Sequence, residues 1–275
     1  MEIIEIIKDA FVFPSKNIQQ LLIYVVLSIL AGAFSVIGTL VYILGFINAQ
    51  CFLFGGLIFI ASLLIGWVLL GYLISVIKSG IDLDDEVPVF EWWENFITGF
   101  NNFIVSIVYY IIPAFIVVVV GYATNAQGIF KVLSQDILIL VHNAYKGSAN
   151  AFLLSPIAQD MISLVAYLAL LITFALVLFV IFSFIQTMAE ARLANTGSLC
   201  EALNVWEAAK DIKRIGIGKV IIVILLVIII IAVIEGILST IFNYVPILSI
   251  LSIIISPYLL FFSQRAVGLL YSDIA

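Results

Sequence analysis

The residue of this chain with the clearest chemical potential is an acid inside an otherwise uncharged apolar run. Glu235 directly follows residues 220–234, of which all but one are Val, Ile or Leu. If this run crosses a membrane, an ionisable group within it costs several kcal/mol unless it is paired or neutral. Glu235 lies 16 residues after Lys219, roughly 24 Å along a helix axis and toward the outer third of a span. The two interpretations are a proton or cation site and a glutamate that snorkels to the interface.

Two prolines lie inside apolar runs and would each leave one backbone carbonyl without its helical donor. Pro113 would free the carbonyl of Tyr109, and Pro257 would free that of Ile253. Freed carbonyls can coordinate ions in transporters, although a plain packing kink is the ordinary role of such prolines. A transporter is supported only if Glu235 and the two prolines line one polar cavity.

A third group of polar residues lies where apolar runs end. Glu190 and Arg192 end one run, and Arg265 ends the last one. With the acidic segment 82–86 they could form a polar collar on the cytoplasmic face. The alternative is simple anchoring at the membrane interface.

No motif indicates a metal site, a cofactor site or an enzyme. The acidic segment 82–86 differs from a calcium loop, which needs Gly at position six and Glu at position twelve, where this chain has Val87 and Trp93. His142 is the only histidine, and no nucleophile or second ligand accompanies it in sequence. Phosphate-binding glycine loops and zinc signatures are absent, as is a basic cluster for nucleic acid. We expect a non-enzyme without a cofactor.

The composition identifies the elements that must position these residues. Hydrophobic residues make up 65% of the 275-residue chain and charged residues 10%, whereas soluble domains contain about 45–50% and 25%. Residues 18–77 contain no Lys, Arg, Asp or Glu. A bilayer core about 30 Å thick requires about 20 apolar residues per helix, so the chain is predicted to be an all-α, multi-pass membrane protein.

The apolar runs predict a six-helix bundle that forms a single membrane domain over 1–275. The expected spans are 18–46, 52–77, 103–121, 157–188, 219–241 and 245–262. Amphipathic helices lying in the membrane plane are expected at 1–13, about 89–102 and about 198–214. A capping box, Ser198 with Glu201, would begin the last of these. Residues 128–145 are left open as an interfacial helix, a re-entrant helix or a seventh span.

The basic residues predict the orientation, because cytoplasmic loops carry the excess of Lys and Arg. On this topology one side holds only Lys131 and Lys146. The other side holds the remaining nine: Lys8, Lys16, Lys78, Arg192, Lys210, Lys213, Arg214, Lys219 and Arg265. We therefore expect a cell-membrane protein with both termini in the cytoplasm. The cysteines, Cys51 and Cys200, would lie on opposite sides and would not pair.

Small residues predict how the first two spans pack. Ser28 and Gly32 lie four apart in the first span, as do Ser62 and Gly66 in the second. Helices in lipid approach closely through such positions. We expect a hairpin packed through these four residues, with dimerisation as the less favoured alternative.

Four stretches distributed along most of the chain carry a family resemblance. They are DAFVFP (9–14), GYLI (71–74) with VPVFEW (87–92), EARLA (190–194) with EAL (201–203), and RAVGLLY (265–271). The chain resembles an uncharacterised family of membrane proteins, found mainly in methanogenic archaea and known only as a domain of unknown function. Val87 stands where that family usually has Leu. The resemblance implies a multi-pass topology and brings no activity with it.

These observations favour a non-catalytic membrane module, a scaffold or accessory subunit that presents charged cytoplasmic loops. Its surroundings would be the lipid bilayer, and its partner a cytoplasmic or membrane protein. The alternative is a small-solute or ion transporter that uses Glu235 and the kinks at Pro113 and Pro257.

Overall fold

The structure of this chain is a computed structural model that describes residues 1–124, 128, 131, 134–135 and 156–275. The described residues form two compact units, and the first comprises Met1–Ser106 with Ile185–Ala275. The second comprises Ile107–Phe184. Every regular element in the described part is a helix, as the sequence predicts. Most of the open segment 128–145 lies outside the described residues.

Six helices of the described chain are long and apolar enough to cross a membrane, which confirms the predicted number on length and composition. They are α2 (Ile18–Leu44), α3 (Gln50–Ile81), α4 (Trp92–Ala123), α6 (Pro156–Thr196), α9 (Ile217–Tyr244) and α10 (Ser252–Tyr271), the last preceded by a 3-10 turn, η3 (Pro246–Leu251). Most of them extend past the predicted ends of the spans by one or more turns, because polar residues at their ends continue the helix.

The predicted boundary between an in-plane helix over 89–102 and a span from 103 does not appear as a break. Helix α4 runs without interruption from Trp92. Three phenylalanines on both sides of that boundary, Phe96, Phe100 and Phe103, pack against one ring, that of Trp67 on α3, at centroid distances of 4.9–5.8 Å. Because residues on both sides of the predicted boundary pack against Trp67, this segment packs as one continuous helix.

The second predicted in-plane helix, 198–214, is divided into α7 (Leu199–Ala202) and α8 (Val205–Ile215). Ser198 occupies the N-cap of α7 but makes no side-chain capping bond. The expected partner, Glu201, instead accepts from Arg192 Nη2 at 2.6 Å. Asn204 begins the new helix, and its side chain accepts from the Glu207 backbone N–H at 3.2 Å.

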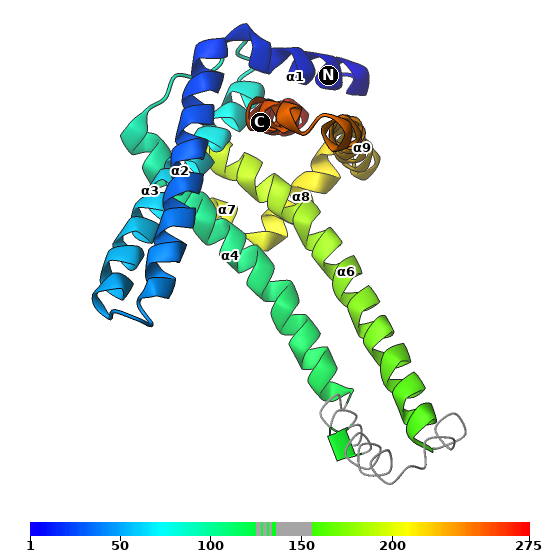
Figure 1. Cartoon of the computed structure of the whole chain (residues 1–275). Helices are drawn as coiled ribbons and strands as arrows, with labels where there is room; N and C mark the ends of the chain where they lie inside the picture. The colour runs from blue at the N-terminus through cyan, green and yellow to red at the C-terminus, as the bar shows by residue number, and fades with distance from the viewer. Residues whose placement is uncertain (125–127, 129–130, 132–133, 136–155) are drawn as a thin grey trace. The chain divides into compact units, whose positions relative to one another are not determined.

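The N-terminal segment is a helix, as predicted, and it packs on other helices. Helix α1 (Ile3–Val12) lies against α10 and α9 and buries Ile6 and Ala10 (Figure 1). The Phe11 ring meets Tyr258 and Phe262 edge-on at 5.9 and 5.6 Å. Pro14 lies in the 3-10 turn η1 (Phe13–Lys16) that follows, and α2 begins after Asn17.

An aromatic core between α2, α3 and α10 holds these helices of the first unit together. Tyr72 is fully buried, stacks on Phe90 at 3.9 Å and lies 5.4 Å from Phe261. Its hydroxyl donates to the Pro88 carbonyl at 2.8 Å, which fastens the loop after α3 onto the core. The cluster consists of Phe13, Leu21, Tyr24, Leu69, Tyr72, Leu73, Val76, Val87, Phe90 and Phe261.

Glycines allow three very close backbone crossings in this unit. A Cβ on Gly71 would lie 1.7 Å from the carbonyl oxygen of Asn95, and one on Gly99 would lie 1.7 Å from that of Trp67. These two positions bring α3 and α4 into backbone contact. A Cβ on Gly268 would lie 2.1 Å from the Ile77 carbonyl oxygen, where α10 crosses α3.

Helices α2 and α3 form a hairpin (Figure 1). Except for Ser62, the small residues through which it packs differ from those predicted. Ser62 is buried and donates to the Ala31 carbonyl of α2 at 2.8 Å, whereas Ser28 bonds within its own helix. A Cβ on Gly32 or Gly66 would meet nothing within 4 Å. The closest approach instead involves Gly38 and Gly55, because a Cβ on Gly55 would lie 2.4 Å from the Tyr42 nitrogen.

In the second unit, polar contacts join α4 to α6. The hydroxyls of Tyr167 and Thr124 lie 2.6 Å apart, and Tyr167 also donates to the Gly121 carbonyl at 3.3 Å. Pro113 lies within α4, which remains helical on both sides of it.

Candidate functional site

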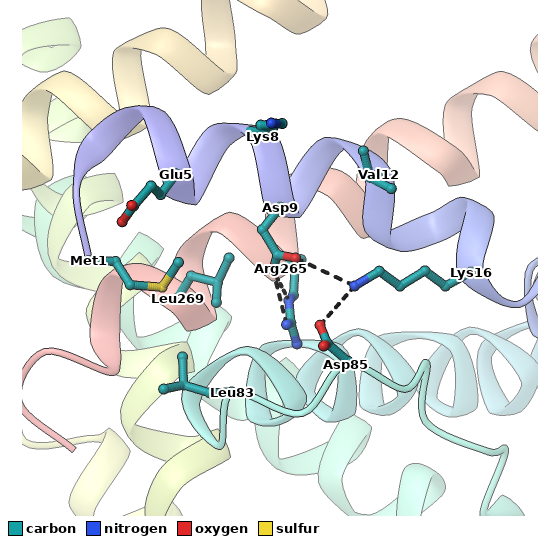
Figure 2. Close-up of a pocket in the computed structure, with 10 residues that line it drawn as sticks. All are labelled: Met1, Glu5, Lys8, Asp9, Val12, Lys16, Leu83, Asp85, Arg265 and Leu269. Carbon is teal, nitrogen blue, oxygen red and sulfur yellow. Dashed lines mark hydrogen bonds and ion pairs between the residues drawn. The ribbon is translucent and has the colours of Figure 1, made fainter.

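Arg265 is one of two charged residues of the described chain that are almost fully buried, and it connects four elements. Its guanidinium donates to Asp9 Oδ2 of α1 from Nε at 3.2 Å and from Nη2 at 3.0 Å. Nη1 donates to the Asp84 carbonyl at 2.6 Å and to Ser79 Oγ at 3.4 Å. The Phe13 ring lies 4.3 Å from the guanidinium carbon, a cation–π contact. We call these residues the Arg265 centre, of which Figure 2 draws Arg265 and Asp9.

Lys16 extends the Arg265 centre toward solvent. Its Nζ donates to Asp85 Oδ1 at 2.8 Å and to Asp9 Oδ1 at 3.5 Å, as Figure 2 shows. The hydrogen bond to Asp85 raises the pKa of Lys16, and the same bond lowers the pKa of the Asp85 carboxyl. Asp85 is largely exposed, so this pair contributes little to stability.

An open cleft of about 650 Å³ borders the Arg265 centre. Its charged lining is balanced, with three bases and three acids: Lys8, Lys16, Arg265, Glu5, Asp9 and Asp85. Because both signs are present in equal number and several groups are already paired, the cleft offers no uncompensated charge to an ion. Its chemistry is that of a clamp between α1, the loop after α3 and α10.

A second centre is built around Asp211 of α8, whose side chain is almost fully buried. Asp211 Oδ2 accepts from Arg192 Nη1 at 2.9 Å and from the Tyr271 hydroxyl at 3.0 Å. Oδ1 accepts from Arg214 Nη1 at 2.6 Å, and this hydrogen bond raises the pKa of Arg214. The Asp211 centre thus joins the ends of α6 and α10 to α8.

The three residues of the predicted collar do not form one group. Arg265 contacts the acidic segment, at Asp84, as the hypothesis expects. Arg192 belongs to the Asp211 centre, and Glu190 accepts from Gln186 Nε2 at 3.0 Å. The two centres are connected through α10, which carries both Arg265 and Tyr271.

Glu235 lines a different feature, an open groove of about 350 Å³ beside η3 and α10. Five further polar side chains line it: Ser239, Asn243, Ser249, Ser252 and Ser256. Neither Pro113 nor Pro257 contributes to this lining. Pro257 is buried within α10 directly after Ser256, and Pro113 belongs to the second unit.

The segment 82–94, which we call the acidic–tryptophan segment, is turned toward the surface. Trp92 and Trp93 are exposed by 57% and 74%. Five of its six acids are exposed and form no ion pair with any described residue: Asp82, Asp84, Glu86, Glu91 and Glu94. Glu91 and Glu94 are close enough to share a hydrogen bond, which raises the pKa of Glu91.

Sequence reasoning missed the acids at the middle of both centres. Asp9 and Asp211 each lie among charged residues of an amphipathic helix, a pattern typical of a solvated face. The only available signal was Arg265, since a buried arginine needs an acid as its partner. The amino-acid sequence does not specify which acid that partner is.

A protein-family model described as "Protein of unknown function (DUF4013)" matches residues 54–243. No curated protein and no solved structure matches the chain. The match includes the resembling stretches around 71–92 and 190–203. The stretches at 9–14 and 265–271, which supply Asp9 and Arg265, lie outside it.

Proposed function

We propose a function from one premise: the chain belongs to the DUF4013 family of proteins of unknown function, whose model matches more than half of its length. The family and the six apolar helices indicate a membrane protein. Within that class we infer a non-catalytic module, a scaffold or accessory subunit. It would offer a partner protein a fixed charged end, by which we mean the Arg265 centre, the Asp211 centre and the acidic–tryptophan segment. It carries no cofactor, binds no nucleic acid and performs no reaction.

The observation that carries this proposal is the concentration of unpaired acids in one segment of the charged end. The bases near this end that form no ion pair with any described residue, Lys8, Lys78 and Lys213, are instead spread over three helices. The bases Arg192, Arg214 and Arg265 are all engaged in ion pairs. Five of the six acids of the acidic–tryptophan segment have no such partner among the described residues, and the loop is fastened through Pro88 and Phe90. A rigid, acidic surface with exposed aromatic rings suits a basic protein partner, since Trp is enriched at interaction hot spots.

The surroundings of the module are part of the same proposal. The distribution of Lys and Arg favours a cell-membrane location with both termini and the acidic–tryptophan segment in the cytoplasm. Helices α1 and α8 would then lie near the headgroups, where the exposed Trp206 of α8 fits the interfacial preference of tryptophan. The sequence resemblance implies that this membrane is that of an archaeon.

A photo-crosslinking experiment in native membranes tests the proposal. We expect a crosslinker at Trp93 or at Glu86 to give one discrete protein adduct of the same mass. A crosslinker at Ile47, exposed at the turn between α2 and α3, is the control and should give no such adduct. With the crosslinker at Trp93, reversing Glu86, Glu91 and Glu94 to Lys should remove the adduct. Equal adducts from Ile47, or adducts that survive charge reversal, would contradict the proposal.

The transporter alternative retains one observation in its favour, the polar groove beside Glu235. Against it, the two prolines do not line that groove. In proteoliposomes we expect no solute or ion flux above that of protein-free vesicles. A flux that Glu235→Gln abolishes would replace the scaffold proposal with transport.

A further inference from the structure

We propose that the groove beside η3 and α10 is a binding site for a small monovalent metal cation, with Glu235 as its one charged ligand. This inference is independent of the proposed function, because the groove and the acidic–tryptophan segment share no residue. Binding there requires neither a partner protein nor transport.

The groove is built from two facing rows of polar side chains. Glu235, Ser239 and Asn243 follow one another at intervals of four on α9 and therefore share one face of the helix. The opposite wall carries Ser249 of η3 with Ser252 and Ser256 of α10. All six line the same space of about 350 Å³.

Most of these side chains have no partner within the described residues. Ser252 Oγ donates to the Ser249 carbonyl at 2.6 Å, and no described residue forms an ion pair with Glu235. Thr240, beside Ser239, points elsewhere and donates to the Gly236 carbonyl at 2.9 Å. Five of the six side chains are exposed in the open groove, and only Ser252 is half-buried. Their oxygens are therefore accessible, and an ion that enters can be coordinated without first breaking contacts within the protein.

The donor set selects the class of occupant. All the ligands on offer are oxygens, from a carboxylate, an amide and hydroxyls, which suits hard cations rather than transition metals. One carboxylate balances one positive charge, whereas calcium sites normally use several. Among the described residues no group of three His, Cys, Asp or Glu side chains could hold a metal ion. At about 30 Å³ per water, the groove holds the ion together with part of its hydration shell.

The position of the groove indicates the side from which the ion enters. Lys219 pairs with Asp273 at the charged end of the first unit. Glu235 lies 16 residues further along α9, roughly 24 Å along the axis. The groove therefore opens toward the opposite end of the helix, and the ion comes from the side away from the charged loops.

Radioactive ²²Na⁺ binding to the full chain in lipid nanodiscs tests the inference. We expect saturable binding that NaCl or KCl displaces and N-methylglucamine chloride does not. Glu235→Gln should weaken the apparent affinity at least about tenfold, equivalent to about 1.4 kcal/mol. Thr240→Val is the matched control on the same helix, and it should bind as the wild type does because Thr240 does not line the groove.

A second variant keeps the test informative if Glu235→Gln does not fold. The double variant Ser239→Ala with Ser252→Ala retains the charge and removes two neutral ligands, so we expect a several-fold loss of affinity. The inference is overturned if the folded wild type shows no saturable binding, or if a folded Glu235→Gln protein binds as tightly. Displacement by ethanolammonium well below the Na⁺ concentration would also overturn it, since the site would then select an organic ammonium group.

Discussion

Among single side chains, Arg265 illustrates how much depends on one residue and how little of this the sequence discloses. Its place at the end of the last apolar run marks it as polar and important. The sequence cannot show that its partner is Asp9, 256 positions away, because the pairing depends on how α1 packs against α10. The same holds for two of the three partners of Asp211, Arg192 and Tyr271, which come from other helices, whereas Arg214 lies three residues further along the same helix.

Removing Arg265 should be far more damaging than removing its neighbour Lys16. The Arg265 side chain is 2% exposed and Lys16 is 31% exposed. Losing one partner of a buried pair costs about 3–5 kcal/mol, whereas an exposed pair contributes about 0–1 kcal/mol. We expect Arg265→Met to lower the free energy of unfolding accordingly and Lys16→Met to change it little. Denaturant unfolding in detergent, followed by tryptophan fluorescence, measures both; similar effects would contradict the buried clamp.

The contact between Lys16 and Asp85 should depend on pH in a defined direction. The pKa of Asp85 is lowered from 3.8 in the folded protein, so its contribution is complete above that value and is lost as the pH falls below it. The pKa of Lys16 is raised from 10.5, so its contribution is complete below that value and is lost at higher pH. The protection of the amides of loop 82–86, measured as the exchange rate relative to the intrinsic rate at each pH, should therefore fall at both extremes.

Asp85→Asn provides the control for this pH dependence. The variant lacks the titrating carboxylate, so the loop should lose less of its protection from exchange at low pH than the wild type does. An unchanged acid limb in Asp85→Asn would assign it to another group.

For the helices, the sequence predicts that each one exists better than it predicts where each one begins and ends. Charge-free runs identify all six apolar helices, because the bilayer imposes a minimum length that few soluble helices meet. The joining of 92–102 to α4 was not predictable in the same way, since it depends on Trp67 of a neighbouring helix. Of the packing residues, Ser62 reaches the partner helix, whereas Gly32 and Gly66 do not, because motif spacing does not specify which face meets a neighbour.

Alanine substitution should separate the glycines at crossings from those at open positions. At Gly99 the new Cβ would overlap the Trp67 carbonyl oxygen, and backbone cannot move aside as a side chain can. We expect Gly99→Ala and Gly71→Ala to destabilise by at least about 2 kcal/mol. Gly66→Ala and Gly32→Ala should stay within about 1 kcal/mol of the wild type, since Ala favours helix. Thermal unfolding of the four purified variants measures this, and equal melting temperatures would refute the crossing geometry.

For the whole molecule, the sequence predicts class and number of spans, and the structure adds how one end is closed. Resembling stretches at 9–14 and 265–271 contain Asp9 and Arg265, and those near 71–92 contain Tyr72 and Phe90. The family resemblance therefore includes residues that contact one another in the structure, but it does not predict those contacts. The orientation in the membrane stays a prediction from the basic residues.

The two free cysteines allow the orientation to be measured directly. Cys200 is exposed on α7, and Cys51 is half-buried at the start of α3. A membrane-impermeant maleimide should label Cys51 in intact cells and reach Cys200 only after permeabilisation. Single-cysteine variants identify each signal, and labelling of Cys200 in intact cells would invert the topology.

The bond between Asp9 and Arg265 has a consequence for how the protein is made. Helix α1 is synthesised before α10, and the guanidinium that binds Asp9 follows 256 residues later. While the intervening segments are synthesised and insert, Asp9 has only the partly exposed Lys16 as a charged partner. Seating of α1 is therefore a late step of biogenesis, and a nascent chain that stops before Arg265 exposes an unseated helix that cellular quality control can recognise.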